Sequence, residues 1–183
     1  MRRNTFTTVL AMTLLLTAGS AFAETARKDL QVFNDVAREV RRYPSYTIFD
    51  DVNAHVQHGV VTLIGKVTMP YKAKDIERLV SRVDGVQAVD NRLEVLPVSS
   101  FDEELRYRIA RAIYGNSSFW QYAAMVNPPI HIVVERGHVT LTGIVGSHVE
   151  RVLARSLASS FGAFSVNNEI KTDAEVTALL ERM

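Results

Sequence analysis

The sequence predicts an α+β fold made of two copies of one small unit, each a small mixed sheet with helices packed on one face. The strand-like stretch GVVTLIGKV at residues 59–67 returns as GHVTLTGIV at residues 137–145, 78 residues later. Apolar residues alternate with polar ones around both stretches, and before and after them they recur at helical spacing. A twofold repeat of the order α-β-β-α-β explains all three observations.

The N-terminus has the pattern of a secretory signal peptide. Arg2 and Arg3 precede an apolar run at residues 9–18, and Ala21-Phe22-Ala23 provides a small-residue cleavage site. The run is shorter than the ~20 residues that a membrane-spanning helix needs. We therefore expect residues 1–23 to be removed, leaving a soluble chain that is periplasmic or secreted and has no transmembrane segment.

Composition excludes several kinds of chemistry. The 183-residue chain has no cysteine, which excludes disulfides, thiolate metal sites, a cysteine nucleophile and the lipid attachment of a lipoprotein. Without Arg2 and Arg3 it would carry 19 basic and 20 acidic residues, a net charge of −1. Such a balance does not favour nucleic-acid binding.

Helical spacing predicts the first element of each copy. In the first copy Phe33, Val36, Ala37 and Val40 mark a helix that Pro44 stops. In the second copy Ser100 should cap the helix and Gly115 should end it. The inward-facing residues of that second helix are Leu105, Ile109, Ala112 and Ile113.

A hairpin follows in each copy. The dipeptides His58-Gly59 and Arg136-Gly137 separate two alternating runs, and glycine tolerates the positive φ of a primed two-residue turn. We take four glycines of the motif as structural residues that define the repeat: Gly59, Gly65, Gly137 and Gly143.

A second helix and a third strand complete each unit. Pro70 should open the helix of the first copy and Gly85 should close it, whereas Ser147 and Glu150 predict a capping box in the second copy. Asn91 and Asn168 occupy matching places in the third strands, with the parity of the inward valines. We predict that both asparagines hydrogen-bond nearby backbone.

These elements give domains at residues 26–96 and 101–172, a linker at 97–100 and a C-terminal tail at 173–183. The repeated G-x-V-T-L-x-G-x-V strand and the V-x-N-x-[LI] strand resemble the BON domain (bacterial OsmY and nodulation), which occurs in tandem in OsmY-like exported envelope proteins. The resemblance implies a non-catalytic protein of the periplasm or exterior that associates with phospholipid membranes or acts in envelope and osmotic stress.

Candidate catalytic and metal-binding groups have simpler explanations. Residues 59–66 end in Gly-Lys but have the spacing of a strand rather than of a phosphate-binding loop. His131 and His138 should be solvated on the sheet and about 13 Å apart, too far to share a metal ion. Asp50 and Asp51 read as a polar loop. We predict no enzyme activity, no metal and no cofactor.

The two copies differ most before the second hairpin. Residues 115–125 are longer than their counterpart and carry four large side chains that could pack internally or contact a membrane or partner: Phe119, Trp120, Tyr122 and Met125. Helical arginines could meet lipid phosphates or form solvated faces: Arg38, Arg41, Arg42, Arg108 and Arg111.

The leading functional prediction is peripheral association with phospholipid through this segment and the arginines. The alternative is a protein-binding or chaperone-like module of envelope and osmotic stress, whose exposed apolar surface holds other proteins.

Overall fold

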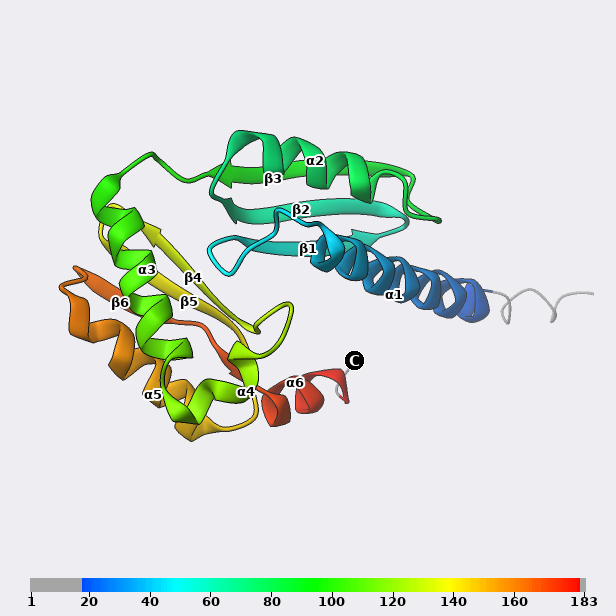
Figure 1. Ribbon diagram of the computed structural model, residues 1–183. Coiled ribbons are helices and arrows are strands. Elements are labelled where there is room, and N and C mark those ends of the chain that lie inside the picture. Colours follow the sequence, from blue (N-terminus) through cyan, green and yellow to red (C-terminus); the bar gives the residue numbers. More distant parts are fainter. Residues whose placement is uncertain (1–17, 182–183) are drawn as a thin grey trace, which may run out of the picture.

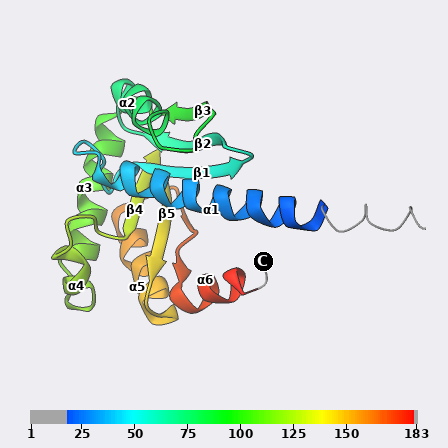
Figure 2. The same cartoon turned by 90° about the vertical axis from the view of Figure 1, so that its right-hand side faces the viewer.

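The structure, a computed structural model, describes residues 18–181. Residues 1–17, with the predicted basic and apolar parts of the signal peptide, lie outside the described residues. Helix α1 (Ala18–Arg42) runs through the predicted cleavage site at Ala23. Figure 2 shows α1 projecting past the end of the β1–β2 hairpin.

The first unit is a three-stranded sheet with two helices on one face (Figure 1). Strand β1 (Asp51–Gln57) pairs antiparallel with β2 (Val60–Val67), and β2 pairs parallel with β3 (Ala88–Val95). Helix α2 (Pro70–Val80) connects β2 to β3 and begins with Pro70 in the first turn, as predicted.

The second unit repeats this plan with additions. Helix α3 leads through the short helices η1 and α4 to the antiparallel pair β4 and β5, and helix α5 and turn η2 lead to β6, which is parallel to β5. The short strand β7 also pairs with β5. The first eight residues of the predicted tail form helix α6. The bounds are α3 Ser100–Tyr114, η1 Ser117–Phe119, α4 Trp120–Ala123, β4 Ile130–Glu135, β5 His138–Val145, α5 His148–Ala158, η2 Ser159–Phe161, β6 Ser165–Asn168, β7 Lys171–Thr172 and α6 Asp173–Leu180.

The predicted α+β class and the repeated α-β-β-α-β order are therefore confirmed. Two local details are also settled. The capping box between Ser147 and Glu150 is present, but the cap of α3 is Ser99 rather than Ser100, because the Ser99 hydroxyl accepts the Asp102 N–H at 3.2 Å.

Both hairpins turn through two residues with positive φ, as predicted. The φ angles are 52° and 75° at His58 and Gly59, and 50° and 78° at Arg136 and Gly137. Each turn is braced by a carboxylate from the preceding helix. Asp29 accepts both turn N–H groups of the first hairpin at 2.8 and 2.9 Å. Asp102 does the same in the second hairpin, at 2.8 and 2.7 Å.

This brace aligns the first helices of the two units. With Asp29 matched to Asp102, the buried residues Val32, Val36 and Val40 of α1 match Leu105, Ile109 and Ile113 of α3. The shift between copies is thus 73 residues in the first helix and 78 in the hairpin, because the second unit has five extra residues between them.

Each unit has its own apolar core. In the first, Val36, Leu63 and Ile76 are fully buried, and in the second Ile109, Ile132 and Leu141 are. The asparagines of the third strands hydrogen-bond to the second helix of their own unit. Asn91 Nδ2 donates to the Ala73 carbonyl at 3.1 Å, and Asn168 Nδ2 donates to the Arg151 carbonyl at 2.9 Å.

The two units meet where the loop before β1 lies against β4. Ile48 and Phe49 pack on the core of the second unit, and the Ile132 N–H donates to the Ile48 carbonyl at 2.7 Å. The Phe49 ring meets Tyr107 edge-on, with centroids 5.1 Å apart. Lys66 also forms an ion pair with Glu135 across the junction. One unit thus places the turn at Thr47–Asp50 against the free edge of the other.

Candidate functional site

The segment that distinguishes the second unit is partly core and partly surface. Phe119 is fully buried and Tyr122 is nearly so, with ring centroids 6.2 Å apart. Trp120, Met125 and Val126 remain exposed, with 72%, 48% and 96% of their residue surface accessible. Of the two roles left open for Phe119 and Tyr122, the structure favours internal packing, because both face inward and hold the segment in place; contact with a membrane or partner would fall to the exposed residues.

Tyr122 ties this segment to the start of α5. Its hydroxyl accepts the Gly146 N–H at 2.9 Å and donates to Glu150 at 3.1 Å. Since Glu150 also completes the capping box with Ser147, one network fixes the segment and the helix end together. Trp120 therefore lies in a segment that these hydrogen bonds hold in place.

The structure does not gather the five candidate arginines. Arg38, Arg41 and Arg42 lie on α1 of the first unit, whereas Arg108 and Arg111 lie on α3, the helix that leads into the exposed segment. Three of them form ion pairs within their own helix. These pairs are Arg38–Asp35 at 2.7 Å, Arg42–Glu39 at 3.4 Å and Arg108–Glu104 at 2.5 Å.

Within residues 18–181, Arg41 and Arg111 are exposed and take part in no ion pair. Arg111 lies in the last turn of α3, next to the exposed segment in the chain. Of the five candidate arginines, Arg111 is the one that has no ion pair among the described residues and lies near Trp120 in sequence.

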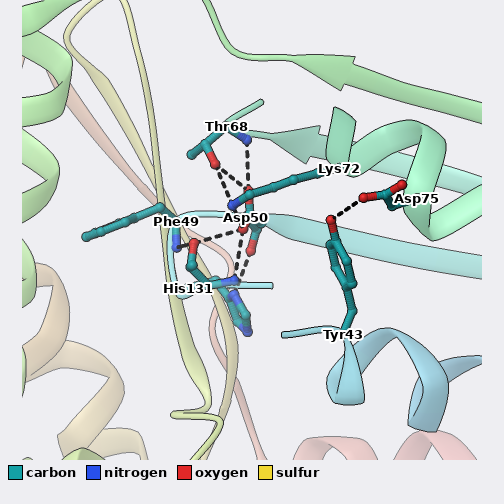
Figure 3. Close-up of polar contacts among 8 residues, drawn as sticks. Tyr43, Phe49, Asp50, Thr68, Lys72, Asp75 and His131 are labelled. Atoms are coloured by element: carbon teal, nitrogen blue, oxygen red, sulfur yellow. Dashed lines mark hydrogen bonds and ion pairs between the residues drawn. The ribbon is translucent and has the colours of Figure 1, made fainter. Parts of the chain in front are cut away.

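A polar cluster missed in the sequence lies at the junction of the two units (Figure 3). Asp50 is completely buried, and Lys72 from the first turn of α2 donates to it at 2.6 Å. The Asp50 carboxylate also accepts the N–H and hydroxyl of Thr47 and of Thr68, at 2.8 to 2.9 Å. Asp50 does lie in the loop before β1, as predicted, but its side chain is buried and ion-paired rather than simply polar and loop-bound.

This carboxylate is structural rather than reactive. Burial alone would raise the pKa of Asp50, but hydrogen bonds from Lys72, Thr68 and Thr47 outweigh it and leave the pKa below its usual value. With five donors around two oxygens, the carboxylate has no site left for a substrate. The cluster therefore joins the loop, β2 and α2 of the first unit.

His131 connects this cluster to the second unit. Its Nδ1 lies 2.6 Å from the Asp50 carbonyl, and its ring centroid is 5.3 Å from that of Tyr46. Burial lowers the pKa of His131, although the hydrogen bond to the Asp50 carbonyl opposes this. The prediction that His131 is a solvated sheet residue was therefore wrong.

This environment predicts a pH-dependent junction. A lowered pKa in the folded state means that the stability from neutral His131 is present above the unfolded value of about 6.5 and is lost as pH falls below it. His131→Gln keeps a hydrogen-bond donor but cannot titrate. Between pH 7.5 and about 5.5 we expect the wild-type melting temperature to fall more than that of His131→Gln. If the melting temperatures of the two proteins fell by the same amount over this pH range, this assignment would be contradicted.

No group that could hold a metal ion is found within residues 18–181. His138 Nδ1 lies 2.7 Å from the Ser165 hydroxyl instead. Two open depressions of ≈ 620 and ≈ 360 Å³ flank α2, and Asp75 and Arg78 line both. Asp75 is already paired with Arg78 and accepts the Tyr43 hydroxyl at 2.8 Å. Neither depression has the converging unpaired groups of a catalytic site.

In the described part of the chain no helix has both the length and the apolar character to cross a membrane.

Comparisons with known proteins agree with the repeat. The BON domain family profile matches twice, at residues 34–97 and 104–174. A search of curated proteins found no match. Among solved structures, CdsD, a structural protein of the type III secretion system of Chlamydia trachomatis, is 13% identical with a TM-score of 0.30, covering 84% of this chain and 99% of that one. The C-terminal domain of CdsD is also 13% identical, with a TM-score of 0.32, covering 79% of this chain and 66% of that one. These distant likenesses support no functional argument.

Proposed function

Because this chain belongs to the BON domain family and contains the domain twice, we propose that it is a non-catalytic binding module of the cell envelope that associates peripherally with phospholipid. BON domains are generally non-catalytic and are associated with membrane binding. The signal-peptide pattern supports export to the periplasm or the exterior.

The exposed segment around Trp120 is the observation that carries this proposal. Trp120, Met125 and Val126 present apolar surface to solvent from a short stretch that the buried Phe119 and Tyr122 anchor. Tryptophan suits a membrane interface, where its ring is buried and its N–H stays hydrated. Because the anchored segment is already ordered, little conformational entropy is lost on insertion.

Arg111 supplies the electrostatic part. It follows Arg108 on α3, and a basic side chain near an anionic surface contributes ~1 kcal/mol. Arg108 contributes less because Glu104 neutralises it. We therefore expect weak, reversible and salt-sensitive binding, stronger on phosphatidylglycerol than on zwitterionic lipid.

Substitution of Trp120 tests the contact. We expect Trp120→Ala to reduce co-sedimentation with phosphatidylglycerol vesicles about tenfold in affinity, since the lost apolar contact corresponds to roughly 1.4 kcal/mol. Val98→Ala is the matched control because Val98 is also an exposed apolar residue but lies in the linker before α3, away from this segment. Equal pelleting of the two variants would refute the assigned contact, and no pelleting of wild type on any vesicle would refute lipid binding.

A second function is favoured by a separate aromatic pair at the other end of the second unit. Phe101 and Phe164 are exposed and stack with centroids 6.2 Å apart, beside the hairpin glycine Gly137. Exposed paired aromatics suit a protein contact. This pair supports the protein-binding or stress-related alternative and becomes the first surface to substitute if vesicles do not bind.

A further inference from the structure

Every outward-facing position of strand β4 has at least one hydrogen-bond partner. In this antiparallel hairpin the backbone groups of Ile130, Ile132 and Val134 point away from β5. The Tyr114 hydroxyl donates to the Ile130 carbonyl at 2.6 Å and accepts the Ile130 N–H at 3.1 Å. The Ile132 N–H is bonded to Ile48, and Arg106 donates to the Val134 carbonyl at 2.7 Å. The edge is thus closed to further strands.

The matching edge of β1 keeps only one of these protections. Its outward-facing residues are Val52, Ala54 and Val56. The backbone of Val52 lies beside the Tyr46 hydroxyl, as Ile130 lies beside Tyr114. Among residues 18–181, however, no hydrogen bond reaches the outward N–H of Ala54 or the outward carbonyl of Val56.

The difference has a sequence cause. In the helix alignment set by Asp29 and Asp102, Phe33 takes the place of Arg106 and cannot donate to the strand. Phe33 is 38% exposed, and its match with Arg106 puts it on the side of α1 toward this edge. Strand β1 therefore combines unpaired backbone with an apolar neighbour, which are the features of a strand that accepts another extended segment.

The chain also carries an unused counterpart of the segment that covers β4. Ile48 lies three residues before Asp51, where β1 begins, and Val126 lies three residues before Pro129. Pro129 matches Asp51 because the carbonyl of each lies against the corresponding hairpin glycine, Gly143 or Gly65. Whereas Ile48 is half-buried against the second unit, Val126 is 96% exposed. Pro128 and Pro129 prevent helix here, and residues 125–127 form a bend, just as Ile48 and Phe49 form a turn in the first unit.

We propose that the Val126 segment of one copy adds to the β1 edge of a second copy, repeating between molecules the contact that Ile48 makes within one. This goes beyond the proposed function, because the β1 edge has no part in the lipid contact, although Val126 belongs to both surfaces. The contact joins two different surfaces, so assembly runs head to tail and forms a ring or an open chain.

The contact between copies should be weaker than the one within the chain. Within the chain, Lys66 and Glu135 form an ion pair across the junction. In the contact between copies, Ile144 and Gln57 would occupy the matching positions, so no ion pair would support that contact. Backbone pairing and apolar contact with Phe33 remain. Association should therefore depend on protein concentration and be insensitive to salt.

Sedimentation velocity of the purified protein, without lipid and across a concentration series, tests the proposal. Wild type is expected to sediment faster as concentration rises. Val126→Lys removes the added segment, and Ala54→Pro removes only an N–H that faces away from β2; each variant alone should stay monomeric. Val149→Lys, an equally polar change at an exposed site on α5, should associate like wild type.

Mixing the two defective variants is the sharper test. Val126→Lys retains an open β1 edge and Ala54→Pro retains the added segment, so their mixture should form dimers and nothing larger. If Ala54→Pro does not fold, Phe33→Arg replaces it, because arginine would close the edge as Arg106 closes β4. Wild type that stays monomeric, or association unchanged in both variants, would overturn the proposal. If wild type is monomeric but binds an added extended peptide that Phe33→Arg does not bind, the contact between copies is wrong and the β1 edge binds a different protein instead.

Vesicle binding separates this proposal from the proposed function. Phe33→Arg and Ala54→Pro should bind phosphatidylglycerol vesicles like wild type, whereas Trp120→Ala should self-associate like wild type. Loss of vesicle binding in Phe33→Arg or Ala54→Pro protein that keeps the far-ultraviolet spectrum of wild type would overturn the assignment of the β1 edge to self-association alone.

Discussion

Asp50→Ala is expected to lower the free energy of unfolding by about 3–5 kcal/mol, because it leaves the Lys72 ammonium buried without its partner. The substitution also removes the acceptor of four hydrogen bonds from Thr47 and Thr68. Chemical denaturation monitored by circular dichroism measures the loss.

A surface ion pair provides the control for this prediction. Glu104→Ala breaks the exposed pair with Arg108 and should change stability by no more than about 0.5 kcal/mol. Lys72→Met in the Asp50→Ala background should recover part of the loss, because no buried charge then remains. An Asp50→Ala protein as stable as Glu104→Ala would show that the pair is not buried in solution.

Phe119→Ala is expected to cost about 3–5 kcal/mol, since it removes a completely buried ring from the core of the second unit. The neighbouring Trp120→Ala should change the free energy of unfolding by no more than about 0.5 kcal/mol, because Trp120 is 72% exposed. Thermal unfolding of the two single variants measures the difference. Similar losses in both would contradict the inward placement of Phe119 and the outward placement of Trp120.

Asp50 and Tyr122 have matching structural roles in the two units. In the first unit Asp50 accepts the Thr68 N–H just before α2 and pairs with Lys72. In the second unit Tyr122 accepts the matching Gly146 N–H and bonds Glu150, the residue that matches Lys72. The extra residues before β4 therefore supply the Tyr122 hydroxyl, which accepts the backbone N–H that the Asp50 carboxylate accepts in the first unit.

The fold could be predicted from the sequence because its signals are local and occur twice. The turn glycines Gly59 and Gly137, the alternation beside them and the capping box of α5 each depend on a few adjacent residues. Asn91 and Asn168 could be placed for the same reason, because their parity in the strand fixes the face on which they lie.

The contacts between distant residues could not be predicted in this way. Asp50 follows a polar loop, and its burial depends on Lys72, which lies 22 residues later. His131 has the parity of a solvated residue, but the other unit covers it. Burial of this kind depends on how two units pack, and a single sequence holds no local signal of that packing.

The longer segment before β4 was ambiguous for a different reason. Four large side chains within seven residues can pack inward or outward, and spacing alone does not separate the roles. Phe119 and Tyr122 lie three residues apart and face inward, whereas Trp120 and Met125 face outward. The asparagine cap at Asn116, which fixes where η1 begins, was the available signal for this register.

The most direct test of the membrane assignment uses the fluorescence of Trp120, the only tryptophan in the chain. Wild-type protein would be mixed with phosphatidylglycerol vesicles containing lipids brominated at different depths along the acyl chain. We predict a blue shift of the emission and strongest quenching by the bromine nearest the headgroup, both reversed by high salt. Pelleting of the protein with unshifted and unquenched Trp120 emission would contradict the contact, and absence of pelleting at any salt concentration would contradict the membrane function.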